Sequence, residues 1–397
     1  MKRQGVLTVN TGSSSIKLSV HGLEGNRLGE RLLRADLSRI GGDMDFAASW
    51  PGGETHDVPG RIAEAGRKSE KLVAAFAQWA SERLDVDLRA VGHRIVHGGG
   101  RFAGPVRASD EVVSELQALS PLAPSHQPAN LSGVAGISGL WPDMPQSLSF
   151  DTAFHRRQPD VAQRYALPRR LTEEGIVRFG FHGLSYAHVA DVLPSLVPGH
   201  DHGRTVVAHL GSGASLCALL DGKSVATTMG LTALDGLPMA TRCGDLDPGV
   251  VLHLLGEGGY SLKEVSHLLY KQSGLLGVSG LSGDIRDLLA SDAPEAAEAV
   301  SLFVYRTVRE IGSLVAALHG LETIVFTGGI GENSAVIRRD VCRELDWLGV
   351  VIDDAANEEG RTIVSASGSS VQVLVIPADE EAVIARETAE VLSASKA

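Results

Sequence analysis

Residues 9–20 read VNTGSSSIKLSV, and the fold of this stretch decides whether the chain opens with a P-loop or with a β-hairpin. A short apolar run at 6–9 leads into it, and apolar and polar residues alternate from 16 to 20, a period typical of a strand. A P-loop needs a second glycine and a helix after its lysine, but Leu18 follows Lys17 and the strand pattern continues. The stretch therefore predicts a β-hairpin, whose turn either binds an anion through its amides or is a solvated turn.

The same pattern recurs about half a chain later. Residues 206–220 read VVAHLGSGASLCALL, again a Gly/Ser turn between two strands, and the Asp-Gly pair at 221–222 is typical of a hairpin. A third glycine-rich stretch, GGIGEN at 328–333, is expected to be a loop between the buried strand at 323–327 and a helix from Ser334. A helix N-terminus after such a loop is suited to bind phosphate or ribose. We therefore expect two similar halves, each opening with a hairpin that faces a shared cleft.

Three longer stretches have the spacing of helices. Residues 61–84 place their apolar side chains on one face, and residues 298–319 do the same before Gly320, a natural helix end. The stretch DEEAVIARETAEVLS (379–393) predicts a terminal helix.

Composition limits the classes of function. A chain of 397 residues with 43% hydrophobic residues predicts two globular domains. A net charge of −12 argues against nucleic acid and anionic membranes as partners. Three cysteines without CxxC spacing suit a reducing compartment, and no apolar run is long enough for a signal peptide or a bilayer span. We therefore expect a cytoplasmic protein.

Five charged or titratable residues stand where a packed core does not need them, and each also has a purely structural explanation. Arg94 lies inside an apolar run, where an ion pair would suffice; Asp151 ends a strand, where it could cap a turn. His182 lies between glycines, Arg242 lies in a Gly/Pro-rich loop whose carbonyls it could bridge, and Glu380 begins a helix that favours acids. Together with three glycine turns and a lysine, they suit phosphoryl transfer, which uses cations for phosphoryl oxygens and a carboxylate for Mg²⁺.

Nine short stretches, taken together, resemble the successive motifs of the acetate kinases. They are VNTGSSSIK, GHRIVHGG, FDTAFH, FGFHG, HLGSGAS, MATRCGDLDP, SGLSGDIR, FTGGIGENS and ADEEAVIAR, in the family's order and over nearly the whole chain. The resemblance implies an α/β fold with two RNase H-like domains flanking a nucleotide cleft (the acetate and sugar kinase/Hsp70/actin fold). The first domain would comprise residues 1–150 with 382–397, and the second residues 151–381.

The resemblance also implies roles for individual residues. The catalytic residues would be Asp151, His182, Arg242 and Arg94. The carboxylate and methyl ends of the substrate would contact Arg94, Val96, Ser125, Phe181 and Ala233. Mg²⁺, for which Mn²⁺ can substitute, would be held largely through water by Asn10 and Glu380. The transferred phosphoryl group and ATP would be bound by Ser13, Ser15, Lys17, His209, Leu210, Gly211, Ser212, Gly213, Asp284, Ile285, Arg286, Gly329, Ile330, Gly331, Glu332 and Asn333.

The implied activity is reversible transfer of a phosphoryl group from ATP to acetate by a homodimer. A carboxylate is already ionised at neutral pH, so positioning and electrostatics would carry the catalysis. Two alternatives stay open: a propionate or other short-chain acyl kinase, and a non-catalytic, nucleotide-switched binding module of the same fold. The paired arginines argue against the module, because a switch does not need cations for a second substrate.

The sequence departs from the family's usual motifs at five positions. Ser212 replaces asparagine, Tyr186 replaces histidine, Ala226 and Ala233 replace aspartate and proline, and Ser125 replaces leucine. The principal charged positions are intact, so these departures bear on the acyl pocket and the phosphate loop.

Overall fold

The computed structural model describes residues 2–12, 15–25, 27–40, 43–66, 69–197 and 203–394. The chain forms two compact units: Met1–Arg156 with Asp379–Ala397, and Arg157–Ala378. Residues 151–156 and 379–381, which the sequence analysis assigned to the second domain, thus belong to the first unit. Asp151 and Glu380 are among them.

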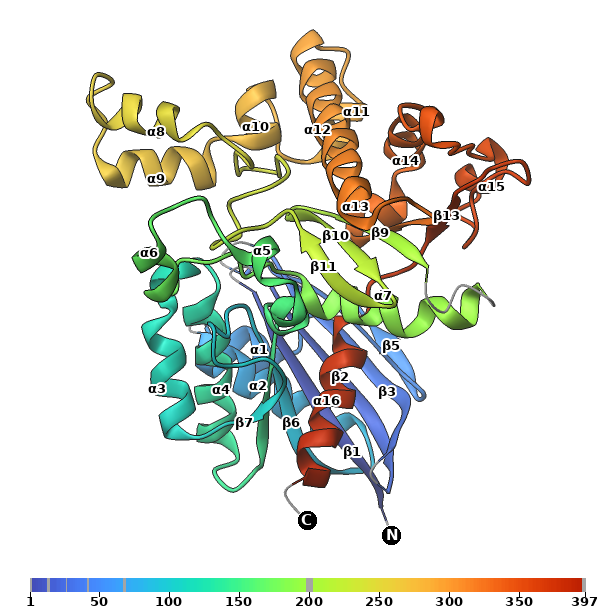
Figure 1. The fold of residues 1–397 in the computed structure, drawn as a ribbon. Helices are drawn as coiled ribbons and strands as arrows, with labels where there is room; N and C mark the ends of the chain where they lie inside the picture. The colour runs from blue at the N-terminus through green and yellow to red at the C-terminus, as the bar shows by residue number, and fades with distance from the viewer. Residues whose placement is uncertain are drawn as a thin grey trace. The chain divides into compact units, whose positions relative to one another are not determined.

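The first unit contains an eight-stranded sheet in the order β5-β4-β3-β2-β1-β6-β8-β7 (Figure 1). The predicted opening hairpin is confirmed: β1 and β2 are antiparallel, and Asn10 pairs with Lys17. Strands β6 and β8 continue the sheet parallel to β1. The strands are β1 (Arg3–Thr11), β2 (Ile16–Glu24), β3 (Arg27–Ser38), β4 (Asp45–Trp50), β5 (Gly53–Thr55), β6 (Val86–Ile95), β7 (Val106–Arg107) and β8 (Gln146–Phe150).

Helices cover both faces of this sheet because successive strand residues point to opposite sides. Leu7 of β1 packs in one core with Phe76 of α2, whereas Val6 packs in another with Ala385 of the terminal helix α16. Figure 1 shows α16 in red, lying across the sheet. The helices of this unit are α1 (Gly60–Glu64), α2 (Ser69–Arg83), α3 (Asp110–Ala118), α4 (Gln127–Leu140) and α16 (Glu380–Ala394), with 3₁₀ turns η1 (Ser120–Leu122) and, across the boundary, η2 (Ala153–Arg157).

The second unit contains a five-stranded sheet in the order β11-β10-β9-β12-β13. Its strands are β9 (Arg204–Leu210), β10 (Ala214–Leu220), β11 (Lys223–Thr227), β12 (Thr323–Thr327) and β13 (Gln372–Val375). Its helices are α5 (Asp160–Gln163), α6 (Arg169–Glu173), α7 (Gly183–Leu196), α8 (Pro248–Leu255), α9 (Leu262–Lys271), α10 (Gly274–Ser279), α11 (Ile285–Leu289), α12 (Pro294–Leu318), α13 (Gly328–Asn333), α14 (Ala335–Arg343), η3 (Asp346–Leu348) and α15 (Asp354–Glu358).

The two sheets share one strand order. In each, the first strand pairs with an antiparallel hairpin partner on one side and with a parallel strand on the other, giving β3-β2-β1-β6-β8 and β11-β10-β9-β12-β13. The internal repeat inferred from the two hairpin motifs is therefore confirmed in the fold. Because the parallel strands of each sheet point the same way, the residues that follow their carboxyl ends gather at one edge.

Two local predictions were wrong. The helix expected over 61–84 is two helices, because α1 ends at Glu64 and the chain turns at Gly66, which has a φ of +70°. GGIGEN, expected to be a loop, forms the short helix α13. A Cβ at Gly328 would lie 2.8 Å from the carbonyl oxygen of Leu210, so glycine lets the chain turn into a helix directly beside β9.

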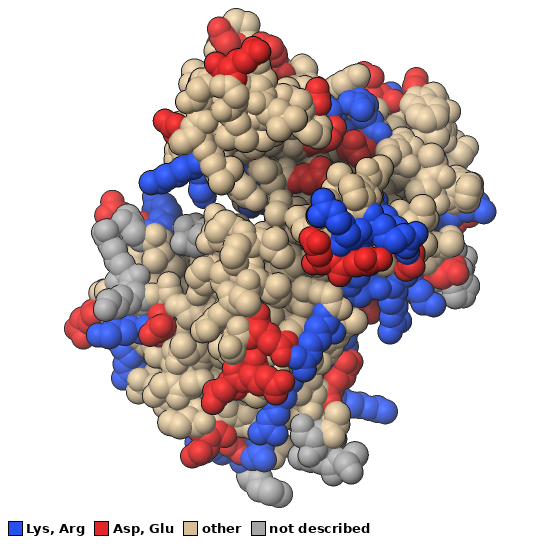
Figure 2. Space-filling view, turned by 60° about the vertical axis from the view of Figure 1, so that its left-hand side comes forward, with Lys and Arg blue, Asp and Glu red and all other residues tan. Residues whose placement is uncertain are grey.

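Acidic and basic side chains are interspersed on the face shown in Figure 2, as expected of acidity that is spread along the chain. No helix in the described ranges is both long and apolar enough to cross a membrane.

Candidate functional site

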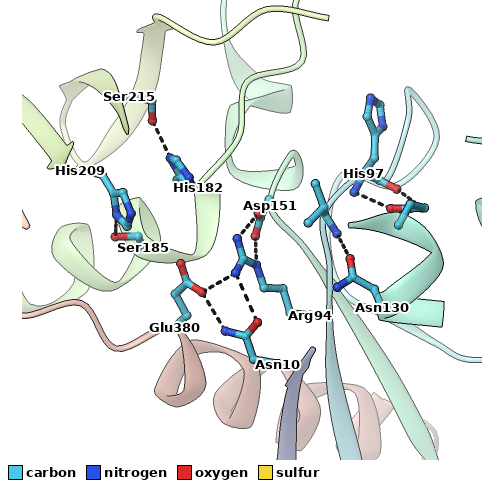
Figure 3. Close-up of polar contacts among 12 residues, drawn as sticks. Asn10, Arg94, His97, Asn130, Asp151, His182, Ser185, His209, Ser215 and Glu380 are labelled. Atoms are coloured by element: carbon cyan, nitrogen blue, oxygen red, sulfur yellow. Dashed lines mark hydrogen bonds and ion pairs between the residues drawn. The ribbon is translucent and has the colours of Figure 1, made fainter. Parts of the chain in front are cut away.

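A charged cluster lies at the carboxyl edge of the first sheet (Figure 3). Asn10 is near the end of β1, Arg94 near the end of β6, and Asp151 directly follows β8. Glu380 and Glu381 join them from the first turn of α16. Strand order brings the three strand residues together, and the packing of α16 on the same sheet adds the two glutamates.

Arg94 is the centre of this cluster. Its Nε and Nη2 donate to the two carboxylate oxygens of Asp151 at 2.9 and 2.6 Å, a bidentate pair. Its Nη1 lies 3.1 Å from Glu380 Oε2 and donates to Asn10 Oδ1 at 3.3 Å. Asn10 Nδ2 in turn donates to Glu380 at 3.0 Å and to Glu381 at 3.2 Å. The guanidinium is thus held by acidic and amide oxygens on all of its nitrogens.

The cluster is acidic, since three carboxyl groups surround one guanidinium. Burial raises the pKa of Asp151 to about 6, against the lowering effect of Arg94. Burial also raises the pKa of Glu381, and the neighbouring Glu380 adds to this, whereas Lys17 lowers it. Although burial opposes the charged form of Arg94, the carboxylates of Asp151 and Glu380 raise its pKa. A cation would therefore be favoured here.

The predicted phosphate-facing turn lies next to this cluster in the sheet. Lys17 is exposed and pairs across the hairpin with Asn10, and it is close enough to influence Glu381. The carbonyl of Ser15 accepts from the amide of Gly12 at 2.7 Å, which closes the turn. Ser13 lies outside the described residues.

In the second unit, His182 is held in an unusual conformation at the start of α7. Its φ of +57° is left-handed, which is rare for a side chain with a Cβ. Its Nδ1 lies 2.8 Å from Ser215 Oγ on β10, and its ring stacks on that of His209, with centroids 4.2 Å apart. His209 Nδ1 lies 2.9 Å from Ser185 Oγ on α7 (Figure 3). Two hydrogen bonds between α7 and the sheet, one to each ring, thus fix the orientation of the stacked histidines.

Arg242 has a very different environment from Arg94. Its Nη1 donates to the carbonyl of Ala233 at 2.9 Å and contacts Met239 Sδ at 3.4 Å. Among the described residues, no carboxylate lies within ion-pair distance of Arg242. Burial lowers the pKa of Arg242. A Cβ placed on Gly213 would lie 3.3 Å from His182 Nε2 and 3.9 Å from Arg242 Nη1. An imidazole nitrogen and a guanidinium with no carboxylate partner among the described residues therefore both lie close to Gly213.

A cavity of about 1030 Å³ opens in the second unit where three glycine-containing loops meet. Its volume is at the upper end of the range for small-molecule sites. Predicted nucleotide-binding residues that line it are Gly211, Ser212, Asp284, Ile285, Arg286, Gly329, Ile330, Glu332 and Asn333. Asp284 caps α11 and forms an ion pair with the exposed Arg286 at 2.6 Å, and Arg286 holds the pKa of Asp284 below its usual range.

The other predicted nucleotide residues do not line this cavity. Leu210 is fully buried as the last residue of β9, and Gly331 packs against the backbone of Phe326. His209 and Gly213 lie instead against His182. Glu332 lines the cavity, but its Oε1 accepts from the amides of Gly328 and Ala378, which secures the loop.

Sequence reasoning missed Arg338, whose side chain is among the largest that are fully buried. It donates to the carbonyls of Gly331 and Glu332 at 2.9 and 2.8 Å, and to both Asn357 oxygens. It thereby joins α13, α14 and α15 around the cavity. The available signal was its helical spacing with the apolar Val341 and Cys342 of α14. Glu381 was also missed, although it lies next to Glu380 in the first turn of the predicted terminal helix.

The four predicted acyl-pocket residues are divided between the units. Val96 and Ser125 are in the first unit, where the amide of Val96 donates to Asn130 Oδ1 at 2.9 Å. Phe181 and Ala233 are in the second, where Phe181 is buried next to His182 and Ala233 provides the carbonyl that accepts from Arg242. A pocket formed by all four stays a prediction.

Comparisons with known proteins agree over almost the whole chain. The family model of the acetokinase family matches residues 5–386. The chain is 48% identical, over 96% of both chains, to an acetate kinase of Rhodopseudomonas palustris (strain ATCC BAA-98 / CGA009). It aligns with a propionate kinase structure from Francisella tularensis subsp. tularensis SCHU S4 at a TM-score of 0.86 and 32% identity, covering 97% of this chain and 98% of that one.

A second solved structure gives the same result. The Porphyromonas gingivalis acetate kinase aligns at a TM-score of 0.81 and 34% identity, covering 98% of this chain and all of that one. The expected fold class, the acetate and sugar kinase/Hsp70/actin fold with two α/β halves, is thereby confirmed. A nucleotide bound between the two units stays a prediction.

Proposed function

The chain belongs to the acetokinase family, and from this premise we propose that it transfers the γ-phosphoryl group of ATP reversibly to acetate. The observation that carries the proposal is the setting of Arg242 described above. A half-buried guanidinium whose partners among the described residues are a carbonyl and a thioether keeps its full positive charge for an anion. Phosphoryl transfer requires such a charge, since negative charge spreads over the equatorial oxygens in the transition state.

The proposed reaction is a single in-line displacement. A carboxylate oxygen of acetate bonds to the γ-phosphorus, while the bond from that phosphorus to the bridging oxygen breaks and its electron pair leaves with ADP. No proton is removed from the nucleophile, because acetate is already ionised. Arg242 and the Nε2 side of His182, which meet at Gly213, would stabilise the charge that develops on the phosphoryl oxygens. The cavity at the three loops would hold the nucleoside part of ATP.

The cluster around Arg94 fits Mg²⁺ held through water. Its net charge is negative, because three carboxyl groups surround one guanidinium, and amide and carboxylate oxygens are the ligands that Mg²⁺ prefers. Among the described residues, no group of three acidic, histidine or cysteine side chains is arranged to ligate a metal directly. Asn10 and Glu380 would therefore hold a hydrated ion, which when bound would neutralise phosphate charge. Arg94 would keep Asp151 and Glu380 in place. When Arg94 binds the substrate carboxylate, acetate would replace Glu380 as the partner of Nη1.

A hydroxamate assay tests the reaction class. The protein is incubated with ATP, Mg²⁺, hydroxylamine and acetate, propionate or butyrate in turn; hydroxylamine traps the acyl phosphate. We expect acyl hydroxamate and ADP in equal amounts with wild type, and a loss of about a hundredfold or more in Arg242→Ala. ADP binding without hydroxamate from any acid would contradict the enzyme and favour the nucleotide-switched module.

A second candidate is a propionate kinase, and it rests on the similar likeness of the chain to solved propionate and acetate kinases. Ser125 and Ala233 are smaller than the leucine and proline usual in the family. Each buried CH₂ contributes about 0.8 kcal/mol, which would offset the overpacking cost of about 1–3 kcal/mol that a tight acetate pocket imposes.

We therefore predict that kcat/KM for propionate lies within about tenfold of that for acetate, a difference of at most about 1.4 kcal/mol. The measurement is kcat/KM for acetate, propionate and butyrate under identical conditions. A value for propionate that is a hundredfold or more below acetate would make the protein a strict acetate kinase. The homodimer, the cytoplasmic location, the use of Mn²⁺ and the absence of nucleic-acid and membrane partners are further predictions.

A further inference from the structure

Tyr186 stands where the family usually has histidine, and it takes part in a chain of hydrogen bonds that ends at His182. Its hydroxyl lies 2.5 Å from Ser215 Oγ, which is 2.8 Å from His182 Nδ1. Tyr186 lies one helical turn after His182 on α7, and Ser215 is on β10. Tyr186 and Ser215 are both fully buried, so water does not compete for these contacts.

The order of donors in this chain follows from acidity. A phenol is a stronger acid, and hence a stronger donor, than an aliphatic hydroxyl. Burial raises the pKa of Tyr186 well above its usual range, and Cys217 adds to this, so the phenol keeps its proton at neutral pH. With Tyr186 donating to Ser215, the serine hydroxyl is free to donate its own proton to His182 Nδ1. A neutral imidazole that accepts at Nδ1 carries its proton on Nε2.

The stacking of His182 on His209 disfavours a positive charge on both rings. Two imidazolium rings with centroids 4.2 Å apart would repel each other, so the pair is most stable when at most one ring is charged. His209 Nδ1 also faces a serine hydroxyl, that of Ser185. Each ring thus has a serine hydroxyl at Nδ1: the sheet provides it for His182, and helix α7 provides it for His209.

We propose that Tyr186, acting through Ser215, is a positioning residue that holds His182 in the neutral tautomer with its proton on Nε2. That nitrogen lies close to Gly213, as does Nη1 of Arg242. His182 then donates a hydrogen bond there without adding a second charge next to Arg242. The catalytic meaning of this arrangement rests on the proposed phosphoryl transfer, but the tautomer itself does not.

The tautomer is tested by ¹⁵N NMR on protein labelled at histidine, without substrates. The spectrum of His182→Gln identifies the His182 signals. We expect wild type at neutral pH to show Nδ1 unprotonated and Nε2 protonated. In Tyr186→Phe, which removes only the hydroxyl, Ser215 can accept as well as donate, so we expect His182 to become a mixture of both tautomers. A proton on Nδ1 in wild type, or unchanged signals in Tyr186→Phe, overturns the proposal.

Kinetics of the same variants separate positioning from a merely structural role. We expect kcat of Tyr186→Phe to fall about tenfold, the effect of one weakened hydrogen bond, with KM for ATP and acetate within about twofold of wild type. Ser215→Ala, which breaks the chain next to the ring, should lose at least as much kcat. Lower thermal stability with unchanged kcat and tautomer would mean that Tyr186 only packs, and would overturn the proposal.

Ser224→Ala is the matched control, because Ser224 is a buried hydroxyl on the adjacent strand β11 that contacts Gln158 and Cys217. It should leave the His182 signals and kcat as in wild type; a loss equal to that of Ser215→Ala would overturn the proposal. If Tyr186→Phe does not fold, Ser215→Ala provides both readouts. The expected tautomer in a protein that forms no acyl hydroxamate would leave this inference standing while contradicting the proposed function.

Discussion

At the scale of single residues, three arginines show how the acceptors around a guanidinium decide what it does. Arg94 is bonded to carboxylates and an amide, so its charge is neutralised within the cluster. Arg338 is buried among carbonyls and the Asn357 amide, so it joins helices. Among the described residues, Arg242 contacts a carbonyl and a thioether but no carboxylate, so its charge is available to a ligand. Residue type alone does not distinguish these cases, because all three carry the same charge.

Gly213→Ala tests whether the reaction occurs close to Gly213, where His182 and Arg242 approach each other. The backbone there needs no positive φ, so the fold should persist, but the new methyl would lie 3.3 Å from His182 Nε2. We expect kcat/KM to fall about a hundredfold, as displacement of reacting groups by about 1 Å does, with an unchanged melting temperature. Gly312→Ala, where the methyl meets open space on α12, is the control. Near-normal activity in Gly213→Ala would place the chemistry elsewhere.

Glu380→Ala separates a role at the cation site from a helix-end role. Glu380 accepts from Asn10 and pairs with Arg94, so its loss should raise the Mg²⁺ concentration needed for half-maximal activity. A purely helix-end role predicts a stability loss of about 1 kcal/mol with unchanged Mg²⁺ dependence. Asp379→Ala is the control, because Asp379 accepts from the amide of Ala382 in the same turn. Mg²⁺ titrations and melting temperatures, measured on both variants, distinguish the two roles.

At the scale of elements, the site depends on helices that reach it from distant parts of the chain. Helix α16 is at the C-terminal end of the chain but packs on the first sheet, where Gly92 of β6 leaves no room for a Cβ: it would lie 2.1 Å from Thr388 Oγ1. This close approach brings Glu380 and Glu381 to the edge of β1. In the second unit, the short helix α13 turns away from β12 and is joined by Arg338 to α14 and α15.

Arg338→Ala is expected to destabilise the second unit and weaken nucleotide binding together. The change leaves a cavity and removes the donors for the carbonyls of Gly331 and Glu332, which together cost about 3 kcal/mol or more. Unfolding by urea and nucleotide affinity by calorimetry are the measurements. Arg339→Ala, on the same helix but paired with Asp340 and Glu358 nearer the surface, should cost less than about 1 kcal/mol. Equal effects of the two variants would contradict a joining role for Arg338.

At the scale of the whole molecule, buried ionisable groups of the first unit are expected to make its stability depend on pH. The core of the first unit contains His21 and His93, and burial lowers the pKa of each to about 4. A histidine whose pKa is lowered in the folded state contributes stability above its ordinary pKa of 6.5, and this is lost as pH falls towards 4. Asp151 acts oppositely, because its contribution is lost as pH rises through about 6. The histidines therefore predict acid lability that Asp151 partly offsets.

His93→Gln isolates one term of this balance. Wild type should lose about 3 kcal/mol more than the variant between pH 6.5 and 4, at about 1.4 kcal/mol per pH unit for one proton. The measurement is the urea unfolding free energy over this range, followed by tryptophan fluorescence, since Trp50, Trp79 and Trp141 are all in the first unit. His56→Gln, a change at the surface of the same unit, is the control. Parallel pH curves for wild type and His93→Gln would mean that His93 does not titrate as expected.

The sequence by itself determined the repeated hairpins, the family and the positions of the principal charged residues. These are properties of short stretches: alternation reveals a strand, a glycine cluster reveals a turn, and the order of motifs reveals kinship. Only the tertiary structure decided which charges meet. Asn10 and Glu380 are 370 residues apart, and Arg94 and Asp151 are 57 apart, so no local pattern could pair them. The same holds for the burial of Arg338 between three helices and for the link from Tyr186 to His182 between a helix and a strand, because both arise where separate elements pack together and exclude water.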